Sequence, residues 1–205
     1  MFSGEKFNTI SHLIGTALAL CGVTILLTLA TLKGDAWKIV SFSIYGVMTV
    51  SLYGISTIYH GISGPWKEFF QRLDYIFIYL MIGGSYTPFT LITIRGKWGW
   101  TIFGIIWGMA FAGILMEIFF GKKFRKYSLP LYLLMGWVAL PALKILYLAL
   151  PVVGFILLLA SGLLYGIGVL FFINDHKFKH GHGIWHLFVI AASLCEYICL
   201  LFYVV

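Results

Sequence analysis

Two histidines near the end of the chain have the spacing of a metal site. The stretch HGHGIWH runs from His180 to His186, and His182 and His186 in it are four residues apart. On an α-helix this spacing places two side chains on one face, about 6 Å apart along the axis. Both imidazoles can then reach one ion, so we predict that His182 and His186 are metal ligands. His176 and His180 are expected in a solvated loop, with His180 as a spare ligand.

A third histidine would complete a zinc site of the catalytic type, and His60 is the candidate. Three neutral nitrogen ligands leave a fourth zinc position open to water, whose pKa zinc lowers to about 7. Because such ligands leave the charge of the ion uncompensated, a carboxylate such as Asp74 is favoured nearby, either on the metal or as acceptor of a hydrogen bond from the water. Asp74 would then be the general base. Ser56, one helical turn from His60, would donate to a developing oxyanion.

An ordinary structural reading of these polar residues stays open beside the functional one. A histidine inside a membrane segment is often a hydrogen-bonded core residue, although ionisable residues in membrane segments tend to be functional. Glu5, Asn8 and His12 open the first apolar segment, and we expect them either to hold the ligand rings by hydrogen bonds or to cap the first helix. Without a metal, the histidines would form a protonatable cluster.

The elements that position these residues are membrane-spanning helices. The 205-residue chain is 61% hydrophobic and only 10% charged, which is too little polar surface for a soluble protein. We predict an all-α integral membrane protein with a single domain over residues 1–205 and an uncleaved first segment. A span needs about 20 apolar residues, and seven stretches qualify: Ile10–Leu32, Trp37–Ile62, Phe69–Ile94, Trp98–Phe120, Ser128–Leu148, Val152–Ile173 and Gly181–Tyr203. The fifth is the least regular, because Pro130 and Pro141 interrupt it.

The distribution of lysine and arginine predicts the orientation of this bundle. Nine of them lie at the N-terminus and in the second, fourth and sixth connections, whereas four lie in the other connections. By the positive-inside rule the N-terminus is cytoplasmic and the C-terminus lies outside. His60, Asp74, His182 and His186 then share one depth near the cytoplasmic face. The net charge of +7 is therefore assigned to membrane topology, and no nucleic-acid partner is expected.

Three charged residues inside the predicted spans need partners or a route to the interface. We expect Lys144 and Glu196 to pair with each other near the outer face, or Lys144 to extend alone to the surface. Glu117, near the cytoplasmic end of the fourth span, is expected to reach the interface beside Lys122.

The same residues resemble the signature regions of the haemolysin III family, the bacterial branch of the progestin and adipoQ receptor superfamily. The similar stretches are EKFNTISH, STIYH, RLDYIFIY, GGSYTPF and HGIWHLF, in this order from the first span to the last. The resemblance implies a seven-helix protein of a bacterial plasma membrane with a cytoplasmic N-terminus. It also implies zinc held by His60, His182 and His186, with Asp74 at the zinc-bound water or the metal, and Ser56 beside it.

The resemblance leaves three functions open for this chain. Similarity to adiponectin receptors and, more distantly, to alkaline ceramidases implies a zinc-dependent hydrolase that cuts a lipid amide or ester at the cytoplasmic face. A non-enzymatic receptor or sensor, with a structural zinc and a lipid as ligand, is the first alternative. A cytolytic protein, as the family name implies, is the second. The oligomeric state stays undetermined.

Overall fold

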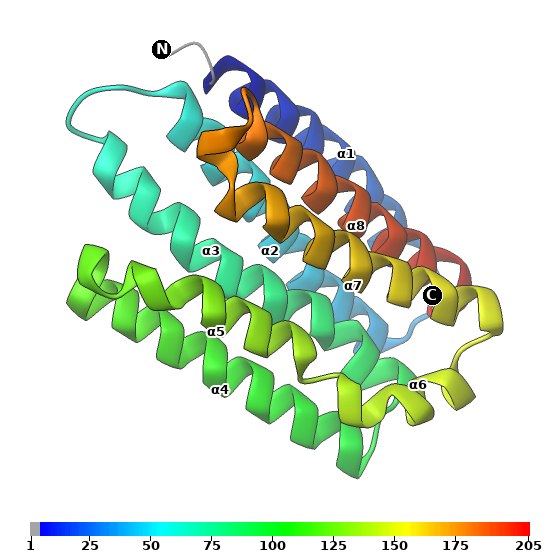
Figure 1. Ribbon diagram of the computed structural model, residues 1–205. Coiled ribbons are helices and arrows are strands. Elements are labelled where there is room, and N and C mark those ends of the chain that lie inside the picture. Colours follow the sequence, from blue (N-terminus) through cyan, green and yellow to red (C-terminus); the bar gives the residue numbers. More distant parts are fainter. Residues whose placement is uncertain (1–4) are drawn as a thin grey trace.

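The chain folds as a bundle of membrane-length helices, as predicted. A computed structural model describes residues 5–205, and within this range seven helical segments are long and apolar enough to cross a membrane (Figure 1). They coincide closely with the seven predicted spans. The helices are α1 (Glu5–Leu32), α2 (Ala36–Gly61), α3 (Lys67–Pro88), α4 (Lys97–Phe120), α5 (Arg125–Trp137), α6 (Leu143–Ala149), α7 (Val152–Ile173) and α8 (Gly181–Tyr203).

Two helices share the fifth span because a proline interrupts it. Helix α5 ends at Trp137, and Pro141 lies in the short 3-10 turn Leu140–Ala142 that precedes α6. Proline lacks the N–H that a continuous α-helix needs and clashes with the preceding turn. Pro130 instead lies inside α5, which membrane helices tolerate when neighbouring groups satisfy the freed carbonyl. The irregularity expected of this span is therefore confined to its second half.

The arrangement of the helices places α2 and α3 at the centre of the bundle. Helix α1 packs against α2 and α8, α8 packs against α7, and α3 packs against α2 and α4. Of the seven spans, α2 and α3 bury the largest shares of their side chains and α7 the smallest. Large apolar side chains such as Leu18, Phe119 and Leu163 are exposed on the outside. In a bilayer this surface faces lipid, which stabilises it as water could not.

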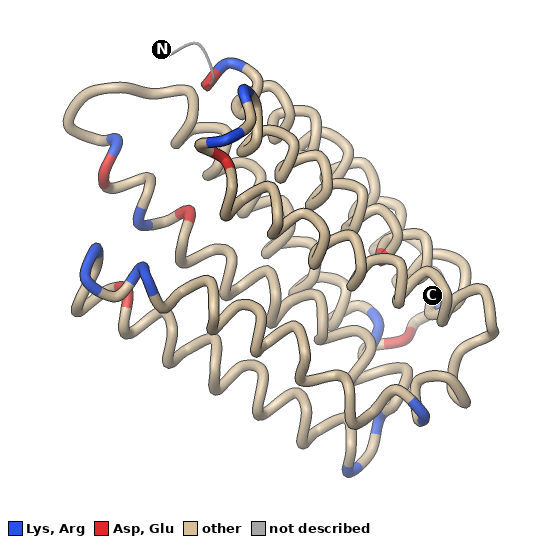
Figure 2. The backbone as a smooth tube through the Cα atoms, viewed as in Figure 1, with Lys and Arg blue, Asp and Glu red and all other residues tan. Residues whose placement is uncertain are grey.

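The charged residues gather at the two ends of the bundle (Figure 2). We call the end at which α1 begins the N-terminal end; α2 ends there, and α3 and α8 begin there (Figure 1). Nine of the fourteen lysines and arginines belong to this end. His60 closes α2 and His182 opens α8, so the histidines expected at one depth do lie at the same end.

Of the two alternatives for Lys144, the pair with Glu196 is wrong and exposure at the surface is confirmed, whereas the expectation for Glu117 is wrong. No ion pair joins Lys144 to Glu196 within residues 5–205. Lys144 is exposed on α6, just after the proline break, whereas the Glu196 carboxyl is buried and faces Ser161 of α7. Glu117 does not reach the interface: it is fully buried and pairs with Arg125 at 2.9 Å, because α5 begins beneath the end of α4. Lys122 pairs with Glu68 instead.

Candidate metal centre

Three histidines from two helices converge at the N-terminal end of the bundle. His60 lies in the last turn of α2, and His182 and His186 occupy the first two turns of α8. One ring nitrogen from each lies within 4.8 Å of the other two, a cluster that could hold a metal ion. The ring centroids are 4.8 to 5.0 Å apart. His60 and His186 are buried, and His182 is partly exposed.

Two of these rings are hydrogen-bonded through their Nδ1 atoms, and the Nδ1 atom of the third faces a carboxylate at a longer distance. The Glu5 carboxylate accepts a hydrogen bond from Nδ1 of His60. Nδ1 of His186 lies 3.1 Å from the Ser11 hydroxyl and 3.3 Å from the Asn8 carbonyl oxygen. Nδ1 of His182 faces the Asp175 carboxylate at 3.8 Å. With Nδ1 engaged, the Nε2 atoms are left to face the centre of the cluster.

An unsatisfied nitrogen shows that the cluster fits a metal. Nε2 of His60 is buried and has no hydrogen-bond partner anywhere in residues 5–205. A buried polar atom without a partner is costly and calls for an explanation such as an ion. Imidazoles whose second nitrogen meets a carboxylate or carbonyl are typical of metal ligands, because that contact fixes the tautomer and the ring orientation.

Helix α1 supplies the residues that hold two of the three rings. Glu5 and Asn8 both approach Nδ1 of His60, with the Asn8 amide nitrogen at 3.5 Å. His12 does not hydrogen-bond to the cluster. Its ring stacks on that of His186, with centroids 3.6 Å apart and planes 11° apart, and its edge meets Tyr53. Within the described residues both ring nitrogens of His12 are buried without a partner.

Asp74 and Ser56 form a second polar group beside the histidines. Asp74 lies in the second turn of α3, and its carboxylate is within hydrogen-bonding reach of the Ser56 hydroxyl of α2. Ser56 is buried, one turn before His60. Asp74 is not part of the group whose ligand atoms lie within 4.8 Å of one another. Ser56 thus lies one helical turn from the candidate ligand His60, and Asp74 is connected to the cluster through Ser56.

Ser11 and Asp175 contact the cluster although the sequence did not single them out. Ser11 follows Asn8 by three residues on α1, a spacing that puts both on one helix face. Asp175 precedes His182 by seven residues, in the 3-10 turn Asp175–Lys177. His180, the expected spare ligand, immediately precedes α8, and its ring packs against Phe7 instead of joining the cluster.

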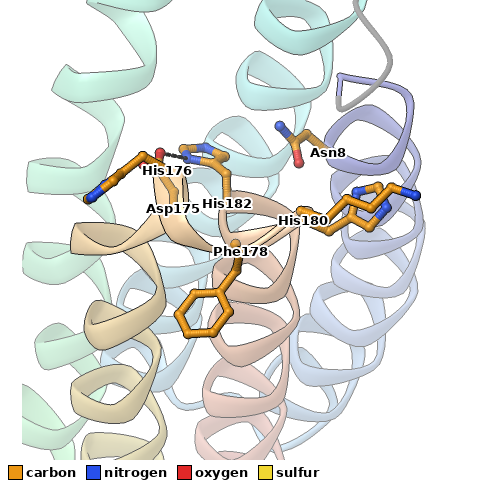
Figure 3. A pocket seen from close by; sticks show the side chains of 9 residues that line it. Asn8, Asp175, His176, Phe178, His180 and His182 are labelled. Carbon is orange, nitrogen blue, oxygen red and sulfur yellow. Dashed lines mark ion pairs between the residues drawn. The ribbon is translucent and has the colours of Figure 1, made fainter.

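A cavity opens beside His182 at the surface of the N-terminal end. Its volume is about 270 Å³, and its lining comes from the start of α1, the α7–α8 connection and the start of α8. Figure 3 shows Asp175 facing His182 across their ion pair, with Asn8 approaching from α1 and Phe178 pointing away. The lining is mostly polar: Asn8, Asp175, His176, Lys179, His180 and His182, with Phe178 as its one large apolar side chain. This cavity gives His182, a candidate metal ligand, direct access to the surface.

Comparison with known proteins finds similar proteins over nearly the whole chain. Residues 1–197 match the protein family described as Haemolysin-III related. The chain is 46% identical to Hemolysin-3 of Bacillus cereus, over 98% of this chain and 91% of that protein. It is 41% identical to a Hemolysin-3 homolog of Bacillus subtilis (strain 168), over 98% and 94%. It is 30% identical to the Monocyte to macrophage differentiation factor of Homo sapiens, over 94% and 78%.

Proposed function

The chain belongs to the haemolysin III family of multi-pass membrane proteins, and on that premise we propose that it is a zinc-dependent hydrolase of a lipid amide or ester. The observation that carries the proposal is the histidine cluster, with each Nδ1 facing a polar partner and Nε2 of His60 buried without one. Three imidazoles suit zinc well among the common divalent ions.

The reaction we propose uses a water molecule held beside the cluster. Zinc bound to three neutral imidazoles supplies a Lewis acid and brings the pKa of a water to about 7. Asp74 takes one proton from the attacking water, whose oxygen bonds to the carbonyl carbon of the substrate. Asp74 then returns that proton to the leaving nitrogen or oxygen as the bond breaks. Because Asp74 stands outside the ligand group, we assign it to the water and not to the metal.

Ser56 has two roles in the proposed mechanism. In the resting state we assign its hydroxyl to the Asp74 carboxylate, which is within hydrogen-bonding reach, as the group that orients the base. When substrate is bound, we propose that it turns to the carbonyl oxygen and stabilises the developing negative charge. One turn of α2 separates Ser56 from the ligand His60, so the Ser56 hydroxyl would lie close to a carbonyl group at the metal.

The uneven distribution of basic residues supports a substrate at the cytoplasmic interface. The excess of basic residues at the N-terminal end assigns that end to the cytoplasm. A polar lipid head then occupies the 270 Å³ cavity beside His182, while its tails lie along the exposed apolar side chains of the neighbouring helices. This arrangement suits a membrane lipid that keeps its head at the interface during cleavage.

The test begins with the metal content of purified full-length protein. We expect about one zinc per chain, because the three ligands make one site, and its loss from the double variant His182→Ala/His186→Ala. His176→Ala is the matched control for metal content alone, since His176 lies in the connection that precedes α8 and outside the cluster. Zinc-loaded protein should then release fatty acid from lipid amides or esters, and the double variant should not. A folded wild type without metal would contradict the proposal.

A structural metal is the second candidate, and one observation favours it. The histidines join α2 to α8, and the partners of their Nδ1 atoms add α1, so a metal would cross-link three helices of a receptor or sensor. In that case zinc removal lowers the unfolding temperature and no lipid is cleaved at any zinc concentration.

A further inference from the structure

The ligand His60 lies at a helix end, where something other than the helix must fix it. Helix α2 ends at Gly61, and the last carbonyls of a helix have no partner within it. The ammonium group of Lys67 donates to the Tyr59 carbonyl oxygen at 2.6 Å and lies 4.2 Å above the Tyr59 ring. Lys67 also contacts Glu5, which holds Nδ1 of His60. Tyr59 is therefore the point at which this last turn is anchored.

A chain of hydrogen bonds runs from Tyr59 across the bundle, away from the histidines. The Gln71 side chain of α3 donates to the Tyr59 hydroxyl at 2.9 Å. Arg125 of α5 donates to the Gln71 carbonyl oxygen at 2.6 Å, and its Nε donates to Glu117 of α4 at 2.9 Å. The Tyr59 ring in turn lies against the His60 ring, with centroids 4.5 Å apart. Four helices are thus linked to one metal ligand.

The far end of this chain is rigid because it is buried. Glu117 is 0% exposed and Arg125 is 12% exposed, and the guanidinium also lies over the Tyr75 ring. Separating a buried ion pair would leave an uncompensated charge, which is costly. The two side chains therefore stay in contact in a fixed geometry. The planar fork of arginine binds Glu117 and Gln71 at once. Because Gln71 accepts from Arg125, its amide nitrogen is turned toward Tyr59.

We propose that Arg125, Gln71 and Tyr59 are positioning residues for His60, so that α4 and α5, which contribute no histidine to the cluster, help to set the metal affinity. The inference rests on the proposed metal site but concerns a different part of the molecule. None of these three side chains touches the metal position, and they act through the orientation of the last turn of α2.

The test measures metal affinity and the geometry of the bound metal in full-length protein in detergent. Tyr59→Phe removes the hydroxyl alone, and Gln71→Met removes the amide at similar volume. Each should weaken zinc binding in competition with a chelator by about 10-fold, the lower end of the range for residues that orient ligands. The double variant should be no weaker than the single ones, because both break the same link. Tyr127→Phe, an exposed tyrosine at the same end, should bind as the wild type does.

Cobalt substituted for zinc provides a measurement that would not change if these residues only stabilised the fold. The visible absorption of bound Co²⁺ reports the arrangement of its ligands, and it should change in Tyr59→Phe and Gln71→Met but not in Tyr127→Phe. Arg125→Lys keeps the charge but not the fork, so it should change the spectrum in the same way.

The possible outcomes separate this inference from the proposed function. If the wild type binds metal and the variants bind it equally well, with an unchanged cobalt spectrum and only a lower unfolding temperature, the network is structural and the inference is wrong. If the folded wild type binds no metal, the inference and the proposed function both fail.

Discussion

At the scale of single residues, a substitution of Asp74 distinguishes a catalytic metal site from a structural one. It stands outside the ligand group but within reach of Ser56. Asp74→Asn keeps the shape of the side chain and removes its capacity to accept a proton. We expect hydrolysis to fall about 100-fold or more, the usual contribution of a general base, with zinc content close to that of the wild type. Fatty-acid release and metal analysis on the same preparation measure both quantities.

Asp175 provides the contrasting variant for this prediction. Its carboxylate faces Nδ1 of His182 at 3.8 Å, so Asp175→Asn should weaken zinc binding, and added zinc should restore turnover. If Asp74→Asn instead loses its zinc and keeps full turnover once zinc is restored, Asp74 is a structural residue and our assignment of the base is wrong.

The sequence could predict the members of the cluster but not all of their partners. His60, His182 and His186 stood out because histidines are rare in apolar segments and because the inferred topology put them at one depth. Glu5 and Asn8 stood out because they lie at the start of the first span, at a similar depth. Ser11 did not, since a serine in a membrane helix is common and its spacing from Asn8 has meaning only once α1 is known to face α8. Asp175 looked like an ordinary residue of a solvated connection.

At the scale of elements, the close approach of α8 to α1 is what brings the ligands and their partners together. Gly183 lies at this contact, and a Cβ there would overlap the Phe7 ring and lie 3.0 Å from Oδ1 of Asn8. We expect Gly183→Ala to push the two helices apart and to destabilise the protein by about 2 kcal/mol, as overpacking does. Zinc binding should weaken with it, because His186 moves away from Ser11 and Asn8, the partners of its Nδ1.

A second glycine supplies the control for this prediction. Gly162 on α7 has nothing within 4 Å of the position that a Cβ would take, so Gly162→Ala should leave the unfolding temperature and zinc affinity unchanged or slightly raised. Thermal unfolding with and without zinc measures both variants. Equal unfolding temperatures and zinc affinities in the two variants would show that the contact between α1 and α8 is loose.

Hydropathy predicted the helices well and their buried charges poorly, for one physical reason. The length and apolarity of a segment indicate that it spans the bilayer, and the structure confirms the seven segments. Hydropathy gives depth along the helix but not the direction in which a side chain points. Hydropathy therefore predicted the end of α4 at which Glu117 lies, but not that its side chain points into the bundle. Lys144 and Glu196 were expected at a similar depth, but the two side chains do not contact each other.

At the scale of the whole molecule, the orientation in the membrane determines which compartment has access to the histidine cluster. Helix α4 crosses the bundle from Lys97 at one end to the turn that contains Lys123 at the other, and both lysines are exposed. The N-terminal end holds nine of the basic residues against four in the connections at the other end, which predicts that Lys123 is cytoplasmic.

We would test this orientation in intact cells with a maleimide that does not cross membranes. The three native cysteines, Cys21, Cys195 and Cys199, are first replaced by serine. Lys97→Cys should then be labelled in intact cells, and Lys123→Cys only after the membrane is opened, which also controls for the reactivity of each thiol. The reverse labelling pattern would show that the bundle has the opposite orientation, with the histidine cluster at the outer face. A cytoplasmic lipid head could then no longer reach the cavity beside His182, and the substrate would have to come from the outer leaflet.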